Sequence, residues 1–263
     1  MEVLLDIIMI PTVLATIKIA VIILLFVMPL GTVLTLMERK WSAMIQDRVG
    51  PNRANIGKFT GHGALHLAAD GLKSIFKEDT IPKGADSFLY LIAPFFGLIA
   101  GVATFAIIPV AGPIGDFTFQ VTDVEPGLLF IFAITSLSVY GAVLAGMSSN
   151  SKFALLGGTR ASAQMISYEV FMGLALMGIF MVYGTTRVSG IVDGQNEYWF
   201  GHLIPMWGVL TQPLGFVLFF TALIAETKRA PFDAPEGESE IVAGYFLEYS
   251  GMRWSAFMLA EYV

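Results

Sequence analysis

The stretch SFLYLIAPFFGLIAGVATFAIIPVAG occupies residues 87–112 and contains no Asp, Glu, Lys or Arg. A bilayer core about 30 Å thick is crossed by about 20 apolar residues of helix, so this stretch is long enough to span a membrane. Three other uncharged runs, at residues 19–37, 127–151 and 204–225, are of comparable length. Their apolar residues are continuous rather than alternating, which favours helices over the strands of a barrel. The sequence therefore predicts an all-α, polytopic transmembrane helix bundle.

The composition indicates the same class of protein. The 263 residues are 56% hydrophobic and only 14% charged, whereas soluble domains carry about 25% charged residues. Two further apolar segments include charged residues. We predict a single membrane domain over residues 1–263 with six spans, at about 12–37, 87–112, 127–151, 161–186, 204–225 and 241–263. The chain has no cysteine, which excludes disulfides and cysteine-ligated iron–sulfur clusters within it.

The Lys and Arg residues are segregated by loop. Cytoplasmic loops of membrane proteins carry an excess of these residues. The predicted loops 38–86, 152–160 and 226–240 hold 12 of the 15, and the loop 38–86 alone holds 8. The intervening loops hold one, Arg187, together with five carboxylates. We therefore predict that the three Lys- and Arg-rich loops are cytoplasmic and that the amino terminus is outside.

The long loop 38–86 is predicted to contain a helix of its own. From Leu65 to Phe76, apolar residues recur at spacings of three and four. The opposite face carries polar residues that include Asp70, Lys73 and Lys77. This pattern is typical of a helix that lies in the membrane surface or against a partner.

Carboxylates inside or beside the apolar segments are the candidates for chemistry. Glu169 interrupts the fourth span, where a charge is costly unless it faces protein or water. The loop 226–240 carries five carboxylates and two cations. We expect a helix that starts near Pro235 and carries Glu236 and Glu240 on one face, with Glu248 two turns later.

Repulsion between neighbouring carboxylates raises the pKa of some members of such a cluster, which a proton relay near neutral pH requires. A solvated acidic loop is the alternative interpretation. Carboxylates also continue into the last apolar segment, at Glu248 and Glu261, which favours the relay.

No metal or nucleotide site is predicted. His62, His66 and Asp70 recur at intervals of four residues, a spacing that can hold a metal ion. A catalytic zinc helix needs a Glu directly after the first His, and Gly63 stands there instead. The polar face of a surface helix explains all three residues. The sequence GGTR at 157–160 follows no strand and lacks a phosphate-loop lysine.

Several motifs together resemble one family, and they cover nearly the whole chain in one order. They are LMERK at 36–40, RVGPNR at 48–53, ADGLK at 69–73, FKED at 76–79, Arg160 with AQ at 163–164, SYE at 167–169, AET at 225–227, Arg229 with PFD at 231–233, and the segment 236–261. The chain resembles the H-subunit family of proton-pumping NADH:quinone oxidoreductase, respiratory complex I, whose mitochondrial equivalent is called subunit 1.

The resemblance implies a membrane-arm subunit that forms much of the quinone-access chamber. It also implies that an acidic path coupling quinone reduction to proton translocation begins in this subunit. The residues that map to the chamber are Glu38, Arg39, Arg48, Glu226, Arg229, Phe232 and Asp233. The residues that map to the proton path are Glu169, Glu236, Glu238, Glu240, Glu248 and Glu261.

The resemblance further implies that this subunit binds no redox cofactor and is not active alone. Quinone is the substrate, and FMN and iron–sulfur clusters lie in partner subunits. The implied partners are other membrane-arm subunits, the peripheral-arm subunits with the iron–sulfur clusters and the quinone site, and the lipid bilayer, with no nucleic acid. The expected location is the bacterial inner (plasma) membrane, with the mitochondrial inner membrane as the alternative.

The family has eight spans, so we expect two further helices and a basic loop beyond residue 263. The resemblance assigns no role to His62 and His66. A secondary proton-coupled transporter is the alternative function, but such a protein binds its substrate near the bilayer midplane between repeats. Here the charge is concentrated at the inside face. A purely structural anchor would not need carboxylates inside its spans.

Overall fold

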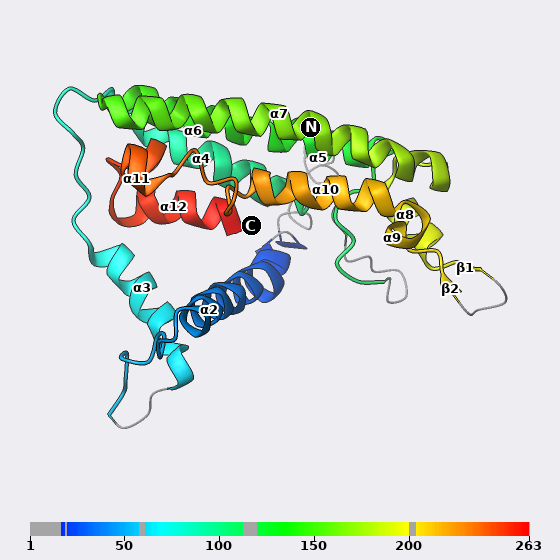
Figure 1. Cartoon of the computed structure of the whole chain (residues 1–263), viewed down its shortest axis with the longest axis horizontal. Helices are drawn as coiled ribbons and strands as arrows, with labels where there is room; N and C mark the ends of the chain where they lie inside the picture. The colour runs from blue at the N-terminus through cyan, green and yellow to red at the C-terminus, as the bar shows by residue number, and fades with distance from the viewer. Residues whose placement is uncertain (1–16, 19, 58–60, 113–119, 200–203, 263) are drawn as a thin grey trace, which may run out of the picture. The chain divides into compact units, whose positions relative to one another are not determined.

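The computed structural model describes residues 17–18, 20–57, 61–112, 120–199 and 204–262 (Figure 1). The chain divides into two compact units. The first unit comprises residues 1–80 with 249–263, and the second comprises residues 81–248. Nearly all described elements are helices, so the all-α prediction is confirmed. The only strands within the described residues are β1 (Tyr198–Trp199) and β2 (Ile204–Pro205), which pair antiparallel.

The second unit is built on three antiparallel helical layers, visible in Figure 1. Asp86 begins the first layer by capping it, because its Oδ1 accepts from the amides of Phe88 and Leu89. The Asp86 amide also donates to the Ser148 carbonyl at the end of the second layer, at 3.1 Å. The layers are α4 (Ser87–Thr104), then α5 (Gly127–Thr135) with α6 (Leu137–Ser148), then α7 (Lys152–Tyr183).

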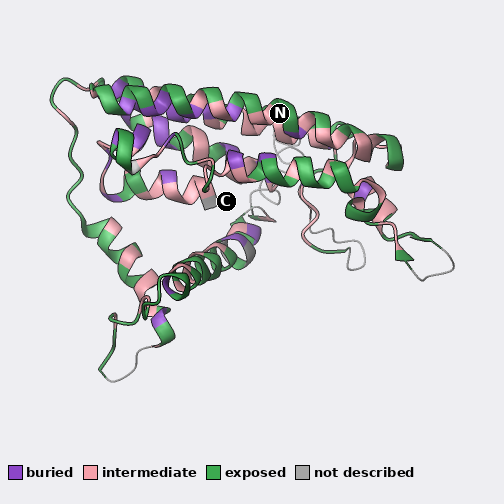
Figure 2. Cartoon of the chain, in the orientation of Figure 1, coloured by how far each residue is buried: buried purple, intermediate pink, exposed green. Residues whose placement is uncertain are grey.

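Small residues form the contacts between these helices. Ala93 of α4, Ala145 of α6 and Ala154 of α7 are completely buried. Large apolar side chains such as Phe95 and Met181 are exposed instead, and exposed residues run along the helices in Figure 2. Small residues at helix contacts with large apolar ones outside are typical of helices packed in lipid.

Three described helical segments are long and apolar enough to cross a membrane by length and composition: α4, α5 with α6, and α7. The count of six spans stays a prediction. At 1.5 Å per residue, the 32 residues of α7 extend about 48 Å, longer than a bilayer core of about 30 Å. Helix α7 is this long because residues 152–160, predicted to be a loop, form its first turns.

The apolar helix α10 (Pro213–Glu226) runs antiparallel along α7. A Cβ on Gly215 would lie 3.2 Å from the Ala175 carbonyl oxygen, and Gln164 reaches the Ala225 carbonyl farther along. The predicted span 204–225 does not form one continuous helix. It begins in β2 and passes through α9 (Gly208–Thr211) before α10. The connection from α7 also contains α8 (Val188–Gln195).

The expected helix from Pro235 through Glu248 is wrong. The structure has only α11 (Glu238–Ile241) and the 3₁₀ turn η3 (Gly244–Phe246) in this stretch. Val242 and Gly244 both have positive φ, at 68° and 67°, which ends the helix. A Cβ on Gly244 would lie 2.1 Å from the Pro235 carbonyl oxygen, so this fold of the chain requires glycine. The carboxylates of this segment therefore do not share one helix face.

The first unit holds the amphipathic helix predicted from residue 65, and that helix is confirmed. The residues that follow this helix contact the last helix of the unit and the residue before it. Arg253 Nε pairs with Asp79 Oδ2 at 3.1 Å, and Ser250 Oγ donates to the Glu78 carbonyl. The elements are η1 (Ile23–Val27), α2 (Met28–Ile45), η2 (Gly61–Gly63), α3 (Leu65–Phe76) and α12 (Gly251–Tyr262). Helix α2 continues eight residues beyond the predicted end of its span at 37.

Candidate functional site

A cavity of about 370 Å³ lies between α2, α3 and α12 of the first unit. Most of its walls are apolar, and they are contributed by all three helices. The apolar lining includes Val27, Met28, Leu67, Trp254, Met258 and Leu259. The charged lining residues are Glu38, Arg39 and Asp70. A largely apolar cavity with a few polar groups is typical of a site for a small organic molecule.

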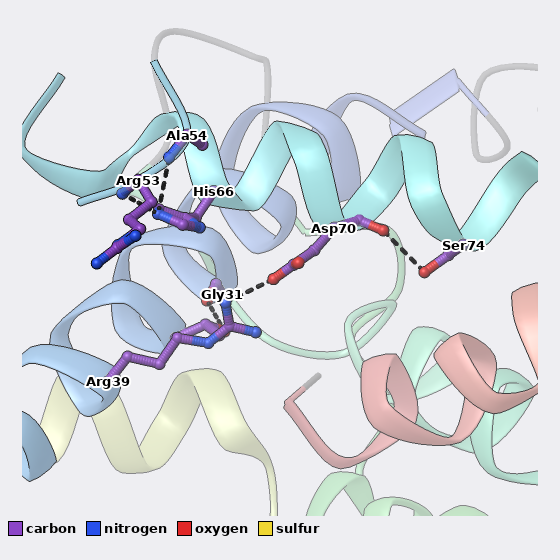
Figure 3. A network of polar contacts seen from close by, with 8 residues as sticks. Gly31, Arg39, Arg53, Ala54, His66, Asp70 and Ser74 are labelled. Carbon is purple, nitrogen blue, oxygen red and sulfur yellow. Dashed lines mark hydrogen bonds and ion pairs between the residues drawn. The ribbon is translucent and has the colours of Figure 1, made fainter. Parts of the chain in front are cut away.

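Arg39 and Asp70 both line this cavity. Their ion pair joins α2 to α3 and is drawn in Figure 3. Arg39 NH1 lies 2.5 Å from Asp70 Oδ2, and both side chains are about half exposed. The Asp70 carbonyl accepts from Ser74 Oγ within α3. Arg39 is one of the predicted chamber residues, and Asp70 is a partner that the sequence does not assign to the chamber.

His66 fixes the loop that precedes α3. Its Nε2 accepts hydrogen bonds from the amides of Arg53 and Ala54, at 2.8 and 3.1 Å (Figure 3). His66 and Asp70, two members of the candidate metal triplet, thus have partners within the protein. Among the described residues, no group of three His, Asp or Glu side chains is arranged to hold a metal ion.

In the second unit, Gln164 of α7 holds the loop that follows α10. Its Nε2 donates to the carbonyls of Ala225 and Phe232, at 2.8 and 2.7 Å. One turn farther along α7, the ring of Tyr168 meets Phe232 edge-on at a centroid distance of 5.3 Å. Phe232 therefore lies beside the α7 turn that carries Glu169.

Glu226 is the last residue of α10 and the first after the predicted span 204–225. Its Oε2 atom is buried and accepts no hydrogen bond from the described residues. The pKa of Glu226 is raised to about 7, chiefly by burial and secondly by the negative charge of Glu169, while the positive charge of Lys228 acts in the opposite direction. The carboxyl group can therefore gain or lose a proton near neutral pH.

Lys228 carries a buried positive charge next to these carboxylates. Its side chain is only 9% exposed. The Nζ atom donates to the Tyr245 hydroxyl at 2.6 Å and lies 3.8 Å from Glu236 Oε1. Tyr245 belongs to η3, so the turn of the chain between α11 and η3 places its hydroxyl beside this lysine.

Comparison with known proteins identifies the family. A family model described as NADH dehydrogenase matches residues 17–263. The first H subunit of the NADH-quinone oxidoreductase of Geobacter metallireducens is 46% identical over 241 residues, which cover 90% of this chain and 69% of the relative. The second H subunit of the enzyme of Geobacter sulfurreducens is 44% identical over the same shares. The chain belongs to the H-subunit family of NADH-quinone oxidoreductases. The family consists of subunits of an oxidoreductase complex.

Three residues that the family resemblance assigned to the proton path, Glu169, Glu236 and Glu240, each have a charged neighbour in the second unit. Glu236 contacts Lys228, and the charge of Glu169 acts on Glu226. Glu240 forms an ion pair with Arg160 of α7, and both side chains are more than one third exposed. Exposed pairs of this kind contribute about 0–1 kcal/mol to stability.

The remaining residues that the family resemblance assigned to the chamber or the proton path lie elsewhere. In the first unit, Arg48 Nε donates to Gln46 Oε1, and Arg48 does not line the cavity. Glu261 is a half-buried residue of α12. In the second unit, the Glu248 carbonyl accepts from the Tyr90 hydroxyl at 2.7 Å. The others lie in the chain between α10 and η3: half-buried Arg229, exposed Asp233, and Glu238, which begins α11.

Asp70, Gln164, Lys228 and Tyr245 are the site residues that the sequence did not assign to the chamber or the proton path. Asp70 and Gln164 stand within motifs that carry the resemblance, but their partners are 31 and 61–68 residues away. Lys228 stands among the five carboxylates of loop 226–240, and that proximity is a signal for a counter-charge. Only the fold brings Tyr245 to it.

Proposed function

We propose that this chain is a membrane-arm subunit of an NADH-quinone oxidoreductase (complex I) in the bacterial inner membrane. In this proposal it forms a quinone-access chamber and the start of a proton path. Both Geobacter relatives carry the name of the H subunit of that enzyme, which supports the assembly. The observation that carries the chamber is the cavity between α2, α3 and α12, with Glu38 and Arg39 in its wall.

The chemistry of the cavity suits a quinone. A quinone has an apolar body and two carbonyl oxygens that accept hydrogen bonds. The cavity offers apolar walls from three helices for the body and the Arg39 guanidinium, a multiple donor, for an oxygen. Because Arg39 also pairs with Asp70, it is held at the cavity in the absence of a ligand. In the proposal, Arg48, Arg229, Phe232 and Asp233 contribute to the chamber through their loops.

The proton path is proposed to run through the carboxylates of the second unit and those that follow. Glu226 supports this proposal because its pKa of about 7 lets it take up and release a proton near neutral pH. Glu236 and Glu240 each face a cation, Lys228 and Arg160 respectively. The proposed members are those that the resemblance implies, Glu169, Glu236, Glu238, Glu240, Glu248 and Glu261, and we add Glu226, which the resemblance assigned to the chamber.

The proposal assigns the redox groups to partner subunits. FMN and the iron–sulfur clusters would lie in the peripheral arm, and this chain would supply only the route and orientation of the quinone. This chain itself would bind no redox cofactor.

Filling the cavity tests the chamber. Gly31 of α2 lines the cavity, and a Cβ at this position would meet no atom within 4 Å. We expect Gly31→Phe in the intact complex to raise the KM for quinone roughly tenfold, equivalent to about 1.4 kcal/mol of binding free energy. Oxidation of NADH by an artificial acceptor should stay normal, because that reaction does not use the chamber.

Gly173→Phe is the matched control. Gly173 lies in α7, also has open space at its Cβ position and does not line the cavity. Its KM for quinone should equal that of the wild type. An unchanged KM and unchanged inhibitor sensitivity in Gly31→Phe would contradict the chamber.

A further inference from the structure

A second, polar cavity of about 340 Å³ lies in the first unit at one end of α3. It shares Arg39, Asp70, Ser74 and Trp254 with the access cavity, so the two cavities are adjacent. Lys73 and Lys77 line only the second one.

The charge of this cavity is unbalanced. Three cations line it, Arg39, Lys73 and Lys77, against the single carboxylate of Asp70. Arg39 is already paired with Asp70. Within the described part of the chain, the ammonium groups of Lys73 and Lys77 have neither an ion pair nor a hydrogen bond. The two lysines are one helical turn apart, and like charges at that spacing repel one another in the absence of an anion.

The surroundings indicate which anion would bind. Leu72, Ile75 and Phe76 of α3 are 56%, 59% and 83% exposed, which is typical of a helix with one face in the lipid surface. Tyr249 and Trp254 line the cavity, and Tyr and Trp are enriched at the level of lipid headgroups. The anion available at that depth is the phosphate of a phospholipid.

We propose that Lys73 and Lys77, assisted by Arg39, bind the phosphate of an anionic phospholipid headgroup in this second cavity. The apolar wall of the adjacent access cavity and the exposed apolar side chains of α3 would contact its acyl chains. This lipid site goes beyond the proposed function. Only its consequence rests on that function: a lipid at the mouth of the access cavity would alter the KM for quinone rather than kcat.

The test uses the intact complex in nanodiscs that contain phosphatidylcholine and phosphatidylglycerol. Lys73→Gln/Lys77→Gln should lower the preference for retained phosphatidylglycerol by up to about thirtyfold, the effect of two surface lysines. Native mass spectrometry measures the retained lipid. Lys73→Arg/Lys77→Arg should keep the preference. Lys83→Gln/Lys152→Gln removes the same charge from two exposed lysines outside the cavity and should also keep it.

Kinetics separate this site from the chamber. Adding phosphatidylglycerol to phosphatidylcholine nanodiscs should shift the KM for quinone in the wild type and not in Lys73→Gln/Lys77→Gln. Inorganic phosphate should not reproduce the shift, and if it does, the assignment to a lipid is overturned. Equal lipid retention by the wild type and the Gln variant would also overturn it. Loss of the lipid without any shift in KM would support the lipid site and count against the access chamber.

Discussion

Lys228 is a buried cation beside the carboxylates of loop 226–240. It is 9% exposed and contacts Glu236 and the Tyr245 hydroxyl. Lys228→Gln would leave the Glu236 carboxylate without this counter-charge. Because Glu236 belongs to the proposed proton path, we expect quinone-linked activity to fall roughly tenfold, equivalent to about 1.4 kcal/mol of activation free energy. Oxidation of NADH by an artificial acceptor should be normal.

Lys228→Arg is the matched comparison, because it keeps the charge. Lys228 has a positive φ of 50°, and Gln and Arg face that backbone conformation equally. Arg should therefore restore a large part of the activity and of the membrane potential that Gln removes. If Gln and Arg reduce both quantities equally, the positive charge is not what matters at this position.

Glu226 should give the complex a titration near neutral pH. Its pKa is raised to about 7, so the carboxyl is mainly protonated at pH 6 and mainly ionised at pH 8. Gln has the shape of the protonated form at every pH. In Glu226→Gln, the inflection near pH 7 in quinone-linked activity should therefore disappear. The quinone-linked activity of the variant at pH 8 should resemble that of the wild type at pH 6.

The control is Glu197→Gln, in an exposed loop that we predict to face outside. It should preserve the pH profile and the membrane potential. The proton path also requires Glu226→Gln to lower membrane-potential formation while artificial-acceptor activity stays normal. A retained inflection together with a normal potential would remove Glu226 from the path.

At the scale of elements, the contact between α7 and η3 depends on Gly157. A Cβ at this position would lie 2.5 Å from the Gly244 carbonyl carbon and the Tyr245 amide nitrogen. Gly157→Ala must push η3 away from α7 and, with it, the Tyr245 hydroxyl from Lys228. Overpacking of this kind costs about 1–3 kcal/mol, so the thermal-inactivation midpoint and quinone-linked activity should both fall.

Gly173→Ala, in the same helix, is the control. A Cβ there would meet no atom within 4 Å, and Ala is favoured over Gly in a helix by about 0.5–1 kcal/mol. The thermal-inactivation midpoint of Gly173→Ala should be unchanged or higher than that of the wild type. A normal midpoint in Gly157→Ala would mean that η3 moves freely against α7.

The elements that the sequence predicts best are those with a strong apolar pattern. Uncharged runs predict α4 and the α5–α6 segment within a few residues of their starts, and the periodicity from Leu65 predicts α3. The start of α7 is missed because the charges of Lys152 and Arg160 predict a loop there. The helix expected from Pro235 fails because Gly244 closes onto the Pro235 carbonyl, a contact that no local pattern reveals.

The candidate site, too, is only partly predictable from the sequence. The resemblance of the sequence motifs to the family points to Glu38, Arg39 and Glu226. The contacts that define their environment join residues far apart in the chain, such as Arg39 with Asp70 and Lys228 with Tyr245. These pairings follow from how the helices pack, and the spacing of charges along the sequence does not encode them.

At the scale of the whole molecule, the burial of a described residue depends on its size rather than on its polarity. Alanines and glycines fill the helix contacts, and large apolar side chains are exposed. In water this arrangement would be unfavourable by about 25 cal/mol for each Å² of apolar surface left exposed. In a bilayer those side chains contact lipid, and close helix contacts stabilise the bundle. The fold is therefore suited to a membrane, in agreement with the apolar runs of the sequence.

Membrane orientation gives the last prediction. Because 12 of the 15 Lys and Arg residues fall in three predicted loops, those loops should be cytoplasmic. The chain has no cysteine, so a single introduced cysteine is its only thiol. Lys83→Cys should react with a membrane-impermeant maleimide only from the cytoplasmic side, and Glu197→Cys only from outside. Both positions are exposed. Gly194 is unsuitable, because a Cβ there would lie 2.6 Å from the Tyr183 ring. Reversed labelling of the two sites would invert the orientation and place loop 226–240, with its carboxylates, on the wrong side of the membrane for the proposed proton path.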